Sequence, residues 1–256
     1  MRALISGAMG RMGQQCIRVF TEEKIELPIL VDPRAETSGG RLFAHFSDVP
    51  AELFCDVAVD FSSPAALDAL LYFCRARKIG AVLATTGFST GQLDTIAEAA
   101  KEIPIFLSRN MSIGVNILGR LCELLARALA PDCDIEIVET HHAAKADAPS
   151  GTALYLADMV KRGNGGGSFV YDRRVSERRK PGEIGIHSLR GGSVVGRHEV
   201  CFFTKGESLY LSHAAEDREL FARGALAAAR FLTAKESGLF GMDDLVEEIF
   251  KSAKIL

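Results

Sequence analysis

The chain opens with Arg2-Ala3-Leu4-Ile5-Ser6-Gly7-Ala8-Met9-Gly10-Arg11-Met12-Gly13. The apolar run at its start predicts a buried strand, and the three glycines lead into residues with helical spacing. A glycine-rich turn at this place leaves backbone N–H groups and the positive end of a helix facing an anion. The stretch therefore predicts a pyrophosphate site of a dinucleotide, the alternative being a turn that is rich in glycine for packing alone.

Apolar strand segments alternate with helical patterns through the first half of the chain. Strands are expected at 2–6, 27–31, 57–61, 81–84 and 104–107, and helices at 10–21, 65–77 and 90–102. This alternation predicts right-handed βαβ units and an α/β fold with a Rossmann-like doubly wound parallel sheet.

The pattern changes after Asn110. A helix is expected at 114–130, strands at 134–139, 184–190, 194–203 and 207–213, and a glycine-rich connector at 163–168. These elements predict an inserted α+β domain with a mixed, largely antiparallel sheet. Helices at 220–232 and 242–250 are expected to rejoin the first domain, so that 1–112 plus 223–256 bind the dinucleotide and 113–222 bind the substrate.

Composition excludes several classes of partner. The formal net charge of −3 gives no general attraction to nucleic acid or to an anionic membrane. No apolar signal region precedes the first strand and no run has transmembrane length, so a cytoplasmic protein is expected. The six cysteines contain no CxxC pair and are expected as reduced core thiols, with no metal or disulfide assigned. Structural roles are expected for the scattered histidines His45, His187, His198 and His213.

Asp32 and Arg34 bear on the identity of the cofactor. Asp32 ends the second expected strand, 19 residues beyond Gly13, where an acid accepts hydrogen bonds from an adenosine ribose. Arg34 is placed to pair with a ribose 2′-phosphate instead. The sequence predicts NADH or NADPH and leaves the choice open.

Two polar segments follow later strands of the same predicted sheet. Ala84-Thr85-Thr86-Gly87-Phe88 comes after the strand at 81–84, and Ser108-Arg109-Asn110-Met111 after the strand at 104–107. Open α/β sheets bind ligands at this carboxyl edge, which favours a cofactor rim over simple turns and hinge packing.

The segment 139–153 concentrates the reactive chemistry of the chain. It reads Glu-Thr-His-His-Ala-Ala-Lys-Ala-Asp-Ala-Pro-Ser-Gly-Thr-Ala. His141, His142 and Lys145 supply a titratable proton carrier and a cation, and Ser150-Gly151-Thr152 are expected to open a helix that presents its first amides to a ligand. Together they predict a carboxylate-binding catalytic cluster. A second basic run, Arg173 to Lys180, is expected as a solvated loop.

These residues resemble one family, the 4-hydroxy-tetrahydrodipicolinate reductases, formerly dihydrodipicolinate reductases. The most specific motif is E-x-H-H-x-x-K-x-D-A-P-S-G-T-A, and the resemblance spans nearly the whole chain. It implies an enzyme of diaminopimelate and lysine biosynthesis that transfers hydride from NADH or NADPH to a cyclic dicarboxylate. It also implies a homotetramer built through the substrate domain.

The resemblance also implies the role of each site residue. His141 and Lys145 would be the catalytic pair. Substrate contacts would come from His142, Lys145, Ser150, Gly151 and Thr152. The dinucleotide would contact Gly7, Ala8, Met9, Gly10, Arg11, Met12, Asp32, Arg34, Ala84, Thr85, Thr86, Ser108, Arg109, Asn110 and Met111. Ala143 and Ala144 replace the basic side chains of many relatives, Arg109 replaces a small residue and Ala84 a glycine.

Two other functions fit parts of the sequence. A dinucleotide-sensing protein would explain the first motif, but it has no need of the cluster His141 to Lys145. Another two-domain NAD(P)-dependent dehydrogenase would leave Ala148 to Thr152 unexplained. The sequence does not distinguish the hydroxylated from the dehydrated ring as the true substrate.

Overall fold

The computed structural model describes residues 1–36, 40–171, 173 and 178–254. It consists of two compact units, Met1–Ile113 with Arg218–Leu256, and Gly114–Asp217. The sequence placed the corresponding boundaries at 113 and 223. In the described part of the chain, no helix is both long and apolar enough to cross a membrane.

The first unit contains a seven-stranded parallel sheet in the order β3-β2-β1-β4-β5-β6-β12. Its strands are β1 (Arg2–Ser6), β2 (Glu26–Val31), β3 (Leu42–Phe43), β4 (Val57–Asp60), β5 (Gly80–Leu83), β6 (Pro104–Leu107) and β12 (Gly238–Phe240). The chain runs outward in both directions from the neighbours β1 and β4. Doubly wound sheets bind ligands at the carboxyl ends of such a strand pair.

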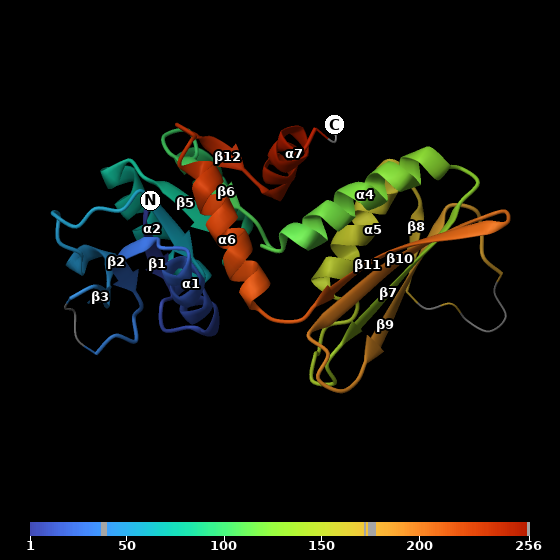
Figure 1. Cartoon of the computed structure of the whole chain (residues 1–256), viewed down its shortest axis with the longest axis horizontal. Helices are drawn as coiled ribbons and strands as arrows, with labels where there is room; N and C mark the ends of the chain where they lie inside the picture. Colours follow the sequence, from blue (N-terminus) through green and yellow to red (C-terminus); the bar gives the residue numbers. More distant parts are fainter. Residues whose placement is uncertain (37–39, 172, 174–177, 255–256) are drawn as a thin grey trace. The chain divides into compact units, whose positions relative to one another are not determined.

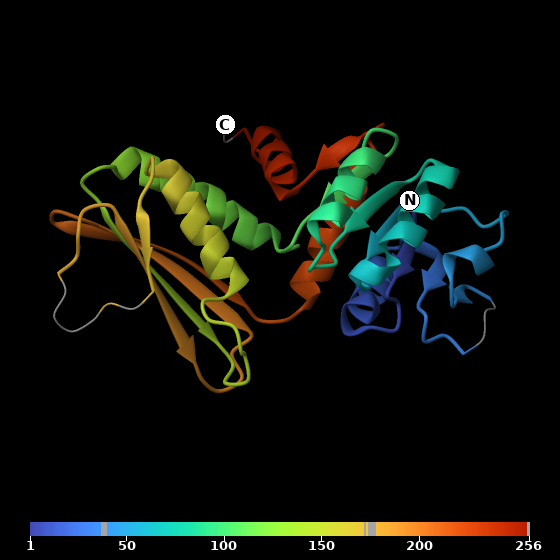
Figure 2. The same cartoon turned by 180° about the vertical axis from the view of Figure 1, so that it is seen from behind.

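Helices cover both faces of this sheet (Figure 1, and from behind in Figure 2). One face packs against α1 (Arg11–Glu22), α6 (Glu219–Leu232) and α7 (Met242–Ser252), the other against α2 (Leu67–Arg77) and α3 (Thr90–Ala99). Short 3₁₀ turns form η1 (Phe46–Asp48) and η2 (Pro64–Ala66). Successive residues such as Leu4 and Ile5 enter opposite cores, which explains why these strands are apolar throughout.

The second unit is a five-stranded sheet in the order β11-β10-β7-β9-β8, with two helices on one face. Its elements are α4 (Ile113–Leu129), β7 (Asp134–His141), α5 (Gly151–Gly163), β8 (Ser168–Val170), β9 (Glu183–Arg190), β10 (Gly196–Thr204) and β11 (Glu207–Ala215). Figure 1 shows α4 and α5 side by side over this face. Gly163 permits the close approach, because a Cβ there would lie 2.1 Å from the Glu123 carbonyl oxygen.

The predicted fold class is confirmed. The second sheet is mixed as expected, although two of its four described pairings, β7 with β9 and β8 with β9, are parallel. The sequence missed β3, β8 and β12, because strands of two or three residues are too short to show a periodicity. All six cysteines are free thiols, and five of them are buried.

Candidate active site

The glycine-rich turn joins β1 to α1. Gly7 has φ of 76°, and its N–H donates to the Val31 carbonyl at 2.9 Å. Gly13 must lack a side chain, since a Cβ would lie 2.1 Å from the Gly7 carbonyl oxygen. The helix begins at Arg11 with Gly10 as N-cap, and no described side chain caps it. The first amides of α1 therefore remain available to an anion.

Asp32 and Arg34 form one hydrogen-bonded pair beside this turn. The Asp32 carboxylate is buried and accepts from Arg34 Nε and Nη2, both at 2.8 Å. It also accepts the Met9 amide at 2.9 Å. Hydrogen bonding from the Arg34 guanidinium outweighs burial and lowers the pKa of Asp32 to about 2. Asp32, which would accept hydrogen bonds from a ribose diol, and Arg34, which would pair with a 2′-phosphate, are thus in direct contact.

The end of β5 is fixed by a buried carboxylate. Asp60, at the end of β4, accepts from Thr85 Oγ1 at 2.6 Å and from Ser62 Oγ at 2.5 Å. Asp60 is only 2% exposed. It holds the chain ends of two neighbouring strands together and leaves Thr86 exposed at the rim. Asp60 was not predicted as a site residue.

The segment after β6 is held by its own side chains. Ser108 Oγ donates to the Asn110 carbonyl at 2.9 Å, and Asn110 Oδ1 accepts the Ser112 amide at 2.9 Å. Met111 is buried against α6, where a Cβ on Gly224 would lie 1.7 Å from the Met111 carbonyl oxygen. Arg109 is exposed. The predicted cofactor residues therefore all lie at the carboxyl edge of the first sheet.

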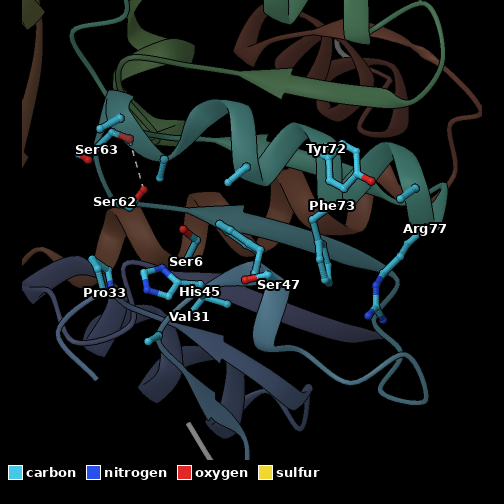
Figure 3. A pocket seen from close by; sticks show the side chains of 16 residues that line it. Ser6, Val31, Pro33, His45, Ser47, Ser62, Ser63, Tyr72, Phe73 and Arg77 are labelled. Atoms are coloured by element: carbon cyan, nitrogen blue, oxygen red, sulfur yellow. Dashed lines mark hydrogen bonds between the residues drawn. The ribbon is translucent and has the colours of Figure 1, made fainter. Parts of the chain in front are cut away.

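A cavity of about 690 Å³ adjoins this edge. It lies between α2 and the chain around η1, and its lining is mainly apolar, with Ser6 and Ser62 at the ends of β1 and β4. Figure 3 shows Pro33 and His45 together near Ser6, while Tyr72 and Phe73 extend from α2. The cavity thus begins next to the glycine-rich turn. No motif of the sequence indicates this cavity.

The second unit places His141 at the end of β7, in a buried polar cluster. Its Nδ1 lies 2.5 Å from Glu139 Oε2. Glu139 is 0% exposed and also accepts both Arg190 Nη atoms, at 2.9 and 2.7 Å. Burial alone would raise the pKa of Glu139, but hydrogen bonds from Arg190, His141 and neighbouring groups lower it to about 2. Glu139 and Arg190 were not predicted as site residues.

Lys145 lies in the loop that follows His141 and leads to the start of α5. The Lys145 Nζ is 2.8 Å from Asp147 Oδ1, and its amide donates to the His142 carbonyl at 3.1 Å. Ser150 caps α5, its Oγ accepting the Ala153 amide at 3.2 Å. The exposed Gly151 begins the helix, with Thr152 half-buried behind it.

His198, for which a structural role was expected, belongs to the same cluster. Its ring centroid is 5.1 Å from that of His141, and its Nε2 is 3.0 Å from Ser150 Oγ. Burial lowers the pKa of His198 to about 4. Antiparallel pairing of β10 with β7 brings His198 next to His141, which lies 57 residues earlier in the chain. The spacing of the two residues in the sequence does not indicate this contact.

The basic run that was expected as a solvated loop is so only in part where the structure describes it, since Arg178 and Lys180 are exposed while two other members bind the sheet. Arg173 and Arg179 both hydrogen-bond Glu136 on the sheet surface. Arg174 lies outside the described residues. In the described ranges, no group of three or more His, Cys, Asp or Glu side chains is arranged to hold a metal ion.

Comparison with known proteins covers both units. A family model described as dihydrodipicolinate reductase, N-terminus, matches residues 1–111, and its C-terminus counterpart matches residues 114–246. The 4-hydroxy-tetrahydrodipicolinate reductase of Clostridium tetani is 43% identical over 93% of this chain and 92% of its own length. That of Caldanaerobacter subterraneus is 43% identical over 96% of this chain and 98% of its own.

Solved structures agree at the level of the fold. Dipicolinate-bound dihydrodipicolinate reductase from Paenisporosarcina sp. TG-14 aligns with a TM-score of 0.81 and 23% identity, covering 95% of this chain and 98% of that one. A probable dehydrogenase from Thermotoga maritima aligns with a TM-score of 0.64 and 13% identity, over 96% and 93% of the two chains. With both units matched by its models, the chain belongs to the dihydrodipicolinate reductase family.

Proposed function

We propose that this protein is a 4-hydroxy-tetrahydrodipicolinate reductase. It transfers hydride from NADH or NADPH to a cyclic unsaturated dicarboxylate and yields tetrahydrodipicolinate, in diaminopimelate and lysine biosynthesis. The observation that supports this most strongly is the His141 cluster beside the start of α5, within a chain whose full-length relatives bear that name. A protein that only sensed dinucleotides would need no such cluster.

The residues of the first unit fit a nicotinamide dinucleotide. A Cβ at Gly7 or Gly13 would clash with neighbouring backbone atoms, so the two glycines leave the space that a pyrophosphate would occupy. No described side chain caps α1, so its amides from Arg11 onward can bind the pyrophosphate. Thr85, Thr86 and the segment Ser108 to Met111 would approach the nicotinamide end. The bound cofactor supplies the hydride.

The cavity beside α2 is proposed for the adenosine. Its apolar lining suits a planar base, and Pro33 and His45 stand where a base would enter from the turn (Figure 3). Its 690 Å³ is ample for one nucleoside.

The Asp32–Arg34 pair supports the use of both cofactors. Arg34 covers both carboxylate oxygens of Asp32, so a ribose diol would have to displace it, whereas a 2′-phosphate would draw the guanidinium away. Arg34 is 59% exposed at its side chain and has room to move. We therefore expect oxidation of NADH and of NADPH.

The second unit is proposed to bind the dicarboxylate. The solved relative from Paenisporosarcina is described with dipicolinate, a cyclic dicarboxylate. Here the amides of Gly151 and Thr152 would hold one carboxylate at the helix N-terminus, with His142 beside it. Lys145 would face a substrate carboxylate, which must take it from Asp147. Ser150 would act by capping this helix.

His141 is the proposed proton donor. Hydride addition leaves an electron-rich, enamine-like ring that must be protonated, and an imidazolium within hydrogen-bonding distance provides the proton. Lys145 would orient the ring and stabilise developing negative charge. We further propose a cytoplasmic homotetramer joined through the second unit.

The test is loss of nicotinamide absorbance when the purified protein meets substrate made in place from pyruvate and aspartate semialdehyde by the preceding synthase. We expect oxidation that depends on the synthase, with both cofactors. Dinucleotide binding without oxidation of either would refute the reductase and favour the sensor.

A further inference from the structure

Glu139 is the most heavily hydrogen-bonded carboxylate of the second unit's cluster. Its Oε2 faces His141 Nδ1 and Arg190 Nη1, while its Oε1 accepts Arg190 Nη2 and the Ser150 amide at 3.1 Å. With no exposed surface, it has no water to replace these donors. Such a saturated acceptor stays ionised and has one orientation.

The sheet explains why Arg190 reaches it. Parallel pairing of β7 with β9 sets Arg190 opposite His141, so its side chain crosses to Glu139 two residues earlier on the same face. The contact is bidentate, a geometry that only arginine provides. Arg190 Nη2 also donates to the Asp147 carbonyl at 2.6 Å. One guanidinium therefore ties Glu139 to the loop that includes Lys145.

The contact with Glu139 determines which nitrogen of His141 is free. A carboxylate accepts only, so the hydrogen shared at 2.5 Å belongs to Nδ1. The other nitrogen, Nε2, faces Gly196 on β10, where a Cβ would lie 3.0 Å away. The missing side chain keeps space open at Nε2. His198 meets the ring at 75° and hydrogen-bonds Ser150 Oγ, so it does not compete for Nε2.

We propose that Glu139, fixed by Arg190, is the positioning residue for His141, accepting its Nδ1–H and leaving Nε2 as the nitrogen that exchanges a proton with the substrate. This inference rests on the proposed role of His141 as proton donor. Arg190 also has a second role, because the same side chain anchors the loop that carries Lys145. It thereby holds His141 and Lys145 in fixed positions relative to each other.

A merely structural role for the pair would predict a different outcome. Buried ion pairs often add little to stability, and removal of one partner destabilises wherever the pair lies. Glu123 on α4 provides the matched control. It is 2% exposed and is bound by Arg120 Nη1 at 2.5 Å and Arg127 Nη2 at 2.9 Å, with no described contact to His141.

The experiment compares Glu139→Gln with Glu123→Gln in the full-length protein. We expect Glu139→Gln to lower kcat by about 10- to 100-fold with KM changed less than about threefold, as outer partners of catalytic groups do. Glu123→Gln should keep kcat within about twofold. Arg190→Lys, which retains the charge but loses the bidentate contact, should fall between them. Equal kcat losses in the two glutamine variants would leave only a structural role.

A spectroscopic readout tests the inference without any turnover. In ¹⁵N-labelled wild-type protein at alkaline pH, the neutral ring of His141 should be the Nδ1–H tautomer, identified by long-range ¹H–¹⁵N correlation after assignment with His141→Gln. In Glu139→Gln this preference should be lost, and in Glu123→Gln it should persist. A wild-type ring protonated at Nε2 overturns the proposal even if Glu139→Gln fails to fold. Absence of wild-type reductase activity would instead count against the proposed function.

Discussion

At the scale of single residues, the polar cluster of the second unit contains two histidines, His141 and His198, with different surroundings. His141 has an ionised carboxylate at Nδ1 and open space at Nε2. His198, 5.1 Å away between ring centroids, is almost fully buried and lacks a described hydrogen-bond partner at Nδ1. The two side chains have the same chemistry, so their different hydrogen bonding and burial come from the residues around them.

His141→Ala and Lys145→Ala should each lower turnover by about 100-fold or more, the size associated with positioned acid–base and charged groups. Steady-state rates in the synthase-coupled assay measure this. His213→Ala, on the neighbouring β11, is the control for loss of a histidine from the same sheet. Near-normal turnover in both His141→Ala and Lys145→Ala would contradict the assignment of the catalytic pair.

The pKa of His198 predicts how stability depends on pH. Its folded value of about 4 lies below the ordinary value of 6.5, so between these values the unfolded chain binds a proton that the folded chain does not. The stabilisation is present above pH 6.5 and is lost as the pH falls towards 4. We expect this residue to cost about 2 kcal/mol of unfolding free energy between pH 7 and pH 5.

Urea unfolding of the wild type and His198→Asn at the two pH values checks this. The asparagine variant should lose less stability on acidification, whereas His45→Asn, at an exposed site, should behave as the wild type does. The same acid sensitivity in His198→Asn and the wild type would show that this ring is not the source.

At the scale of elements, glycines determine how closely helices approach their neighbours. Gly13 brings α1 onto the glycine-rich turn, Gly224 brings α6 onto the backbone at Met111, and Gly163 brings α5 onto α4. Each contact is with a backbone atom, which cannot move aside as a side chain does. The first two lie directly beneath residues proposed to contact the cofactor.

Gly163→Ala should destabilise the second unit by about 1–3 kcal/mol, the usual cost of overpacking. Its Cβ would lie 2.1 Å from the Glu123 carbonyl oxygen. Gly91→Ala is the control, because this position of α3 has no atom within 4 Å of the added carbon and should gain a few tenths of a kcal/mol or more from helix propensity. Thermal unfolding midpoints compare the two. Equal midpoints for both variants would mean that α4 and α5 can separate at little cost.

At the scale of the whole molecule, the described residues place helices on only one face of the five-stranded sheet (Figure 1). Its other face presents Leu189 and Tyr210, which are 54% and 57% exposed, around the ionic cluster of Glu136. A sheet face that no described helix covers and that exposes apolar side chains is a candidate surface for association. This supports assembly through the second unit.

Sedimentation equilibrium should give a mass near four times the 27.6 kDa of one chain. Tyr210→Glu should shift it to smaller species by burying a charge in the interface. Phe54→Glu, which is 61% exposed in the first unit, should leave it unchanged. A wild-type mass of a single chain would rule out the tetramer.

The sequence by itself determined the fold class, because the strands and helices of the first unit other than the short β3 and β12 have a local signature. Apolar runs, helical spacing and the turn at Gly7 to Gly13 depend only on residues near one another in the chain. The cluster from His141 to Thr152 was likewise visible as a local concentration of chemistry, and its roles remain predictions.

Only the tertiary structure decided which distant residues surround that cluster. Glu139 appeared in the motif, but its partner Arg190 is 51 residues away and reaches it only through the β7–β9 pairing. His198 arrives through β10, and Asp60 meets Thr85 through adjacent parallel strands. Strand pairing brings together residues that are far apart in the chain. The residues that surround the cluster can therefore be identified only from the folded sheet.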